Sequence, residues 1–132
     1  MEYGIDAIWH VCHTFLMAYE VEFTDEFEVW WNNLSVAEQD DVRNGVLLLE
    51  THGPMLGRPY VDTLKGSAFA NMKELRVQHA GRPYRVLFAF DPRRAAMLLI
   101  GGDKTGNNRF YEEMLPKAEA IYTQHLRELE RE

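Results

Sequence analysis

The chain has 132 residues, the length of one domain, and its apolar fraction of 46% is typical of a folded globular protein. No apolar run reaches the ~20 residues of a bilayer-spanning helix, and Glu2 and Asp6 stand where a secretory leader needs positive charge. The one cysteine, Cys12, has no partner for an internal disulfide, so the sequence predicts a protein of the reducing cytoplasm without a membrane partner.

The net charge of −7 is unevenly distributed along the chain. Residues 1–57 carry a net charge of −10, residues 58–109 carry +6 and residues 110–132 carry −3. A basic region between acidic flanks suggests an anionic ligand such as nucleic acid. However, lysines and arginines also coat the exposed faces of many sheets, and an acidic chain repels phosphate, so charge alone leaves both interpretations open.

We predict an N-terminal extension at residues 1–18, with apolar residues at helical spacing, ahead of one domain at residues 19–132. Met17 would also serve as a translational start, and the sequence does not decide between the two. Two histidines and one cysteine lie close together in the extension, but no further ligands follow at zinc spacing. The sequence therefore predicts neither a metal nor another cofactor.

The first part of the domain predicts a strand and a helix hairpin. Residues 19–23 alternate apolar and acidic side chains, as a half-buried strand does. Thr24 is a suitable N-cap for a first helix. Ser35 and Glu38 form a capping box for a second helix, which Gly and Pro at 53–54 end. The aromatic residues of this hairpin are more typical of a core than of a binding platform.

The second part of the domain predicts a small sheet. After a loop-rich segment with a brief strand near Val61–Leu64, three strand-like runs follow: Met72–Gln78, Tyr84–Phe90 and Ala95–Ile100. Turns at 80–83 and 91–94 make them an antiparallel meander. A terminal helix begins near Phe110, and Pro116 either kinks it or starts a second segment. The predicted fold class is α+β, a small antiparallel sheet packed against an N-terminal helix hairpin, with a C-terminal helix.

Strand periodicity separates two faces of the meander. If the first turn closes His79 on Tyr84, Arg76 lies opposite Leu87, and Arg76 and Arg85 share one face. A slip of one residue would undo this arrangement. The other face carries the predicted core side chains Leu75, Val77, Tyr84, Val86, Phe88 and Phe90.

The chemistry of the chain is concentrated around this sheet. No serine nucleophile elbow, paired-cysteine metal site or phosphate-binding loop is present in the sequence. The remaining polar set is Lys73, Arg76, His79, Arg85, Lys104, Arg109 and Tyr111. Such residues can cleave RNA without a metal, because the ribose 2′-hydroxyl is an internal nucleophile that needs a base, an acid and cations around the phosphorane. Each residue also has a purely structural interpretation, such as an ion pair between Arg85 and Glu74.

Two segments carry a resemblance to a known family: MKELR…GRPYRVLFAFDPRRAAMLLIGGDKTG, and RFYEEMLPKAEAIYTQHL after it. Over residues 19–129 the chain resembles the HigB/Gp49-like branch of the RelE/ParE toxin superfamily. The resemblance implies the toxin of a type II toxin–antitoxin system, a RelE-like fold and ribosome-dependent mRNA cleavage. It also implies inhibition by a cognate helix-turn-helix, HigA-like antitoxin.

The resemblance also assigns roles to residues. The implied catalytic residues are Arg76, Arg85, Lys104 and Tyr111, with His79 as an alternative to Tyr111 in proton transfer. From the charged residues of this region we also predict RNA binding by Lys65, Lys73, His79, Arg82 and Arg109. RelE-type enzymes carry a lysine pair before the Leu-Arg, where this chain has Lys73 and Glu74.

Two alternatives to a ribonuclease remain open at the level of sequence. One is a ParE-like toxin of the same fold that inhibits DNA gyrase and cleaves nothing. The other is a degenerate, non-enzymatic protein that binds an antitoxin. The acidic helices favour a basic partner and fit an antitoxin in all three cases.

Overall fold

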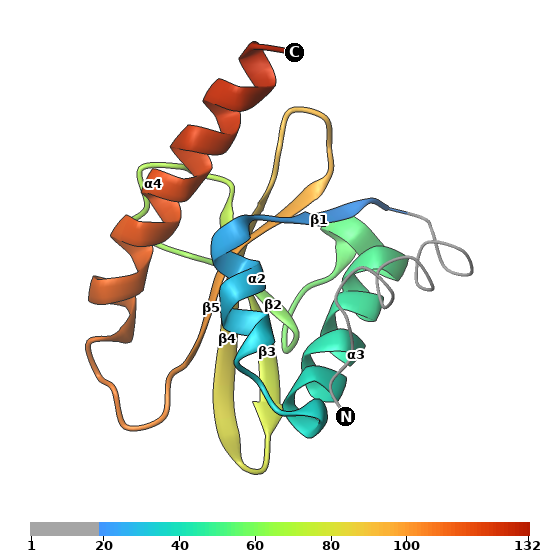
Figure 1. Ribbon diagram of the computed structural model, residues 1–132, viewed down its shortest axis with the longest axis vertical. Helices are drawn as coiled ribbons and strands as arrows, with labels where there is room; N and C mark the ends of the chain where they lie inside the picture. Colours follow the sequence, from blue (N-terminus) through green and yellow to red (C-terminus); the bar gives the residue numbers. More distant parts are fainter. Residues whose placement is uncertain (1–18) are drawn as a thin grey trace.

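A computed structural model describes residues 19–132 of the chain, and the predicted extension at residues 1–18 lies outside them. The described part has the predicted α+β fold, with helices on both faces of one sheet (Figure 1). Its elements are β1 (Val21–Phe23), α2 (Asp25–Asn32), α3 (Val36–His52), the 3-10 turn η1 (Gly53–Met55), β2 (Val61–Thr63), β3 (Met72–His79), β4 (Arg82–Phe90), β5 (Ala96–Asp103) and α4 (Phe110–Glu130).

The sheet has five strands in the order β1-β5-β4-β3-β2. Strands β3, β4 and β5 form the predicted antiparallel meander, and β2 adds to β3 in antiparallel orientation. The predicted first strand joins the other edge, where β1 pairs with β5 in parallel. The two short strands therefore close both edges of the meander and leave its three long strands inside.

The helix hairpin has the predicted caps. The Thr24 hydroxyl accepts a hydrogen bond from the Phe27 N–H of α2, and Ser35 and Glu38 form a reciprocal capping box at the start of α3. Helix α4 runs without interruption through Pro116, although an interior proline removes one backbone hydrogen bond. Packing of α4 on the sheet outweighs this local cost.

Two apolar clusters cover the two faces of the sheet. The face toward α2 and α3 carries the predicted core side chains, of which five are buried and Phe90 packs at the margin. The face toward α4 carries a second cluster that includes Leu87, Leu99 and Tyr122. Burial on both faces explains why the runs of β4 and β5 are almost continuously apolar.

The predicted register of the β3–β4 hairpin was wrong by two residues. The turn contains only Ala80 and Gly81, whose φ values of 49° and 78° are both positive, as in a two-residue turn of type I′. Arg76 therefore lies directly opposite Arg85. A shift of two residues preserves the faces, so Arg76 and Arg85 share one face as predicted.

A buried carboxylate fixes the far end of α4. Asp91 follows β4, is 4% exposed, and accepts hydrogen bonds from the Arg93 side chain at 2.7 Å and from the Ala95 N–H at 3.3 Å. The Nε2 atom of His125 on α4 lies 2.8 Å from the same carboxylate. Burial alone would raise the pKa of Asp91, but the hydrogen bonds from Arg93 and His125 outweigh it and lower the pKa below its usual value.

Gly101 lies where β5 meets the aromatic side chains of α2. A Cβ atom added at this position would lie 2.3 Å from Trp30, whereas one at Gly57 would meet nothing within 4 Å. We expect Gly101→Ala to lower the free energy of unfolding by about 1–3 kcal/mol, because the packed ring must move. Gly57→Ala should change it by less than about 0.5 kcal/mol in the same urea titration. Equal effects of the two changes would contradict this packing.

The Asp91 cluster predicts a pH dependence of stability. The pKa of Asp91 is lower in the folded than in the unfolded protein, so its ionised carboxylate stabilises the fold. This stabilisation is complete at pH values above the unfolded carboxyl pKa of about 3.9 and is lost as the pH falls through the lower folded pKa. Asp91→Asn should lower the free energy of unfolding by about 2 kcal/mol at pH 7 and by much less at pH 2–3. Glu112→Gln, in an exposed ion pair with Arg109, should cost under about 1 kcal/mol at any pH. A pH-independent cost for Asp91→Asn in urea titrations would contradict the prediction.

Candidate functional site

The candidate site is built around Glu74, a carboxylate on β3 that is only 2% exposed. Its Oε1 accepts a hydrogen bond from the Tyr111 hydroxyl at 2.5 Å, and its Oε2 accepts one from Arg76 Nε at 3.1 Å. The Nε of Arg85 lies 3.5 Å from Oε1. One buried anion thus joins side chains from β3, β4 and α4.

Strand alternation and pairing create this cluster. Glu74 and Arg76 are two residues apart on β3, so both point to the face that α4 covers. Arg85 lies opposite Arg76 on β4 and shares this face. Tyr111 reaches it from the first turn of α4. A lone buried carboxylate would be strongly unfavourable, but here two guanidinium groups compensate its charge and one phenol donates a hydrogen bond to it.

Two adjoining hollows open beside the cluster. The first is lined by Leu64, Lys65, Glu74, Arg76, Lys104, Tyr111 and Leu115. The second is lined by Pro59, Tyr60, Arg76, Gln78 and Arg85. Because Arg76 lines both, the two hollows adjoin on one face of the sheet, and together we call them the basic groove.

The groove has an excess of positive charge. Four cationic residues line it, Lys65, Arg76, Arg85 and Lys104, against the carboxylate of Glu74. The nearby carboxylate of Asp62 is shared by Arg58 at 2.8 Å and Arg76 at 3.4 Å. Such a surface attracts anions.

Arg85 is positioned to bind a further anion. Its Nη1 donates to the Tyr84 carbonyl at 3.0 Å, and its side chain is only 9% exposed. Its Nε is buried and makes no hydrogen bond within the described part of the chain. The Nε lies against Glu74, so a ligand in the groove would meet the other N–H groups of this guanidinium, which carries five in all.

Tyr111 is held as a neutral phenol. Burial and the hydrogen bond and charge of Glu74 raise the pKa of Tyr111, while Arg85 lowers it to a smaller extent. The hydroxyl is therefore protonated at neutral pH and can donate a proton or a hydrogen bond. The Lys104 ammonium lies 5.2 Å from the centre of the Tyr111 ring, within range of a cation–π interaction.

The structure brings together five of the sequence-predicted site residues. Arg76, Arg85, Lys104 and Tyr111 lie around Glu74, and Lys65 reaches the same hollow from the loop after β2. Arg109 lies just before α4, pairs with Glu112 at 3.1 Å and does not line the groove.

Three other predicted residues lie toward the helix hairpin, on the opposite face. His79 bonds to Asp41 of α3 at 2.7 Å, and Lys73 lies 3.4 Å from the Thr63 hydroxyl. Arg82 lies over the Tyr84 ring and pairs with Asp103 at 3.2 Å. Period-two alternation accounts for the separation, because these residues are out of phase with Arg76 and Arg85.

Sequence reasoning did not identify Glu74 as the centre of the site. Its two-residue spacing from Arg76 was visible and placed it on the same face. Its burial depends on α4 packing over that face, which the strand pattern does not reveal. The sequence also gave no reason to select Tyr60, which lines the second hollow.

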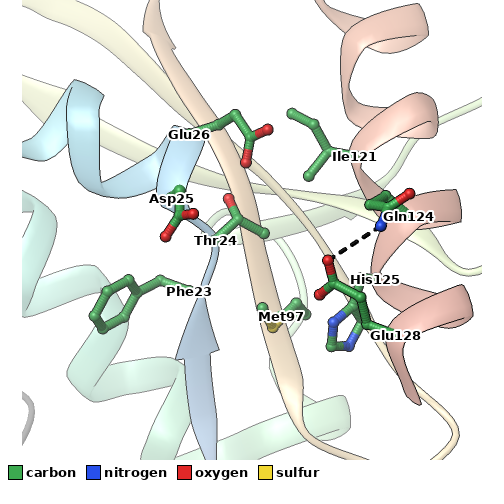
Figure 2. A pocket seen from close by; sticks show the side chains of 9 residues that line it. All are labelled: Phe23, Thr24, Asp25, Glu26, Met97, Ile121, Gln124, His125 and Glu128. Carbon is green, nitrogen blue, oxygen red and sulfur yellow. Dashed lines mark hydrogen bonds between the residues drawn. The ribbon is translucent and has the colours of Figure 1, made fainter. Parts of the chain in front are cut away.

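A separate hollow lies between the start of α2 and α4 (Figure 2). It is lined by Phe23, Thr24, Asp25, Glu26, Met97, Ile121, Gln124, His125 and Glu128. Its charged side chains are mainly acidic, so it does not suit a phosphate group. Among residues 19–132, no group of three or more His, Cys, Asp or Glu side chains could hold a metal ion. Within the same residues no helix is long and apolar enough to cross a membrane.

Comparison with known proteins identifies the family. Residues 29–123 match the family model described as "Phage derived protein Gp49-like". The match spans most of the chain, so the protein belongs to the Gp49-like family. This confirms the resemblance found in the sequence.

Two relatives come from Mycobacterium tuberculosis (strain ATCC 25618 / H37Rv). The protein named "Putative toxin HigB3" is 48% identical over 95 residues, which are 71% of this chain and 82% of the relative. The protein named "Putative toxin HigB2" is 40% identical over 108 residues, which are 80% of this chain and 54% of the relative. No solved structure matches the chain significantly.

The contact between Glu74 and Tyr111 predicts a measurable titration. In Glu74→Gln the pKa of Tyr111 should fall, because the carboxylate that opposes the phenolate is gone while Arg85 remains. NMR of tyrosines labelled at the ring Cζ would follow each hydroxyl. Tyr84 is an internal control, since burial and Glu38 raise its pKa to about 12 from the opposite face. An unchanged Tyr111 titration would show that the two groups do not interact.

Proposed function

We propose that this protein is the toxin of a type II toxin–antitoxin system and an endoribonuclease that cleaves mRNA on translating ribosomes. One observation carries the proposal: Arg76, Arg85, Lys104 and Tyr111 converge on a basic groove around Glu74. The relatives named as HigB toxins support the toxin role. The groove supports an RNA substrate, because its cations suit a phosphodiester.

The proposed reaction is an internal transfer of the phosphodiester. The ribose 2′-oxygen attacks the adjacent phosphorus, the P–O5′ bond breaks, and the products are a 2′,3′-cyclic phosphate and a free 5′-hydroxyl. A base must take the 2′-hydroxyl proton, and an acid must give a proton to the leaving O5′. No metal is required if cations of the protein stabilise the charge on the phosphorane.

The geometry suggests a role for each residue. Arg76 and Arg85 lie side by side and would bind the non-bridging oxygens. Glu74 is covered and bonded to Arg76 and Tyr111, so it would hold these two side chains in place, and Tyr111 would take part in proton transfer. Lys104 would add positive charge beside Tyr111. His79 lies on the opposite face, so Tyr111 is preferred for proton transfer.

We also propose that a HigA-like, helix-turn-helix antitoxin neutralises the protein. The acidic first turn of α2 supports a partner with a basic contact surface, because it carries Asp25, Glu26 and Glu28 without a basic residue in its last turn. This surface is separate from the basic groove.

Arg85→Ala tests the nuclease proposal. Purified protein would be added to a translation extract with one defined mRNA, and cuts would be read by primer extension. Cleavage should fall at least ~10²-fold, because a preorganised donor to the phosphorane is lost. Arg127→Ala removes an exposed cation from the other end of α4 and should cleave like the wild type.

Three results would contradict the proposal. If Arg85→Ala cleaves normally, the groove is not the active site. If the wild type arrests growth while messages stay intact, gyrase or another target is favoured. If it neither arrests growth nor cuts RNA, the protein is a binding partner only.

A further inference from the structure

An exposed tyrosine lies beside the two arginines of the groove. Tyr60 is 46% exposed, one of few large apolar side chains on the described surface. It lines the second hollow together with Pro59, Gln78, Arg76 and Arg85. The proposed catalytic chemistry uses the two arginines and leaves Tyr60 and Gln78 without a role.

The backbone holds Tyr60 in a fixed place. Its carbonyl accepts a hydrogen bond from the Arg76 N–H at 2.7 Å, and its N–H donates to the Gly57 carbonyl at 3.0 Å. Since Val61 pairs with Leu75, these bonds extend the β2–β3 pairing by one residue and place Tyr60 opposite Arg76. The ring is therefore presented by an ordered backbone.

Tyr60, Arg76 and Arg85 consequently form one row across three adjacent chain segments. Arg76 pairs with Arg85 on one side and neighbours Tyr60 on the other. Neighbouring strands lie ~4.8 Å apart. A phosphate bound by the arginines would thus have an aromatic ring within one nucleotide of it.

We propose that Tyr60 and Gln78 form a nucleobase subsite next to the phosphate-binding arginines. The Tyr60 ring would stack on an unpaired base of single-stranded mRNA that flanks the cleaved phosphate. The Gln78 side chain is exposed at the same hollow, and its amide has both a donor and an acceptor for a base edge. This inference rests on the proposed function and adds to it a determinant of where the message is cut.

Phosphate binding alone requires only cations, so it does not account for the exposed ring of Tyr60 beside the two arginines. Lysine and arginine alone bind phosphates without regard to sequence. An aromatic ring at the same site binds bases of any kind, and a neighbouring amide favours particular edges. The subsite therefore predicts a base preference at one position beside the cut.

The test compares cut sites in the translation extract for the wild type, Tyr60→Ala, Tyr60→Phe and Gln78→Ala. Loss of stacking in Tyr60→Ala should lower the cleavage rate about 5- to 150-fold. Tyr60→Phe keeps the ring and should cleave like the wild type. Gln78→Ala should keep most of the rate and weaken the base preference at one flanking position. Met55→Ala, which removes an 84% exposed side chain that lines neither hollow, is the matched control.

The outcomes separate this inference from the proposed function. If Arg85→Ala is inactive but Tyr60→Ala cuts at the wild-type rate and sites, the subsite is overturned and the nuclease stands. If Tyr60→Phe is as impaired as Tyr60→Ala, the ring does not act by stacking and the inference fails. If the wild type cuts no message, both proposals fail together. Thermal unfolding of each variant would confirm that it is folded.

Discussion

The site depends on one buried carboxylate shared by two guanidinium groups and a phenol. Glu74 is almost fully covered, yet Arg76 and Tyr111 donate hydrogen bonds to its oxygens, and the charge of Arg85 lies 3.5 Å from one of them. Removing the carboxylate would leave two guanidinium groups facing each other at the sheet surface. The electrostatic balance at Glu74 thus couples the groove to the docking of α4.

This arrangement has a direct consequence for ligand binding. Two guanidinium groups against one carboxylate leave a net positive charge at the floor of the groove, and Lys65 and Lys104 increase it. The side chains that would meet a phosphate are already held by the fold before any ligand arrives. Such preorganisation is what stabilisation of a phosphorane requires, because no reorganisation is needed during the reaction.

The acidic balance of the chain does not conflict with an anionic ligand. Negative charge gathers on helix α2 and in the hollow beside it, whereas four cations of 58–109 line the groove on one face of the sheet: Lys65, Arg76, Arg85 and Lys104. The protein thus has separate surfaces of opposite sign. A nucleic acid and a basic protein partner could contact different faces of the same small domain.

Much of this fold follows from local sequence signals. The caps at Thr24 and Ser35, the strand order of the meander and its core face depend on residues close in sequence. The hairpin register was missed because Pro83 suggested a longer turn, whereas Ala80 and Gly81 make it alone. A residue with a side chain rarely adopts positive φ, so Ala80 gave no signal of its own.

The site was less accessible to sequence reasoning because it depends on contacts between distant segments. Arg76 and Arg85 could be joined by strand pairing alone. Lys73 and His79 point to the other face because side chains alternate along a strand. Residue type alone had grouped them with Arg76 and Arg85. The central position of Glu74 could not be predicted, because Tyr111 approaches it from 37 residues away.

The most direct test of the account is a crystal structure of the protein with a short RNA that carries 2′-O-methyl riboses and cannot be cleaved. The account predicts a phosphate bound between Arg76 and Arg85, with Tyr111 beside its ribose. An RNA bound instead on the opposite face, near Arg82 and Lys73, would contradict it.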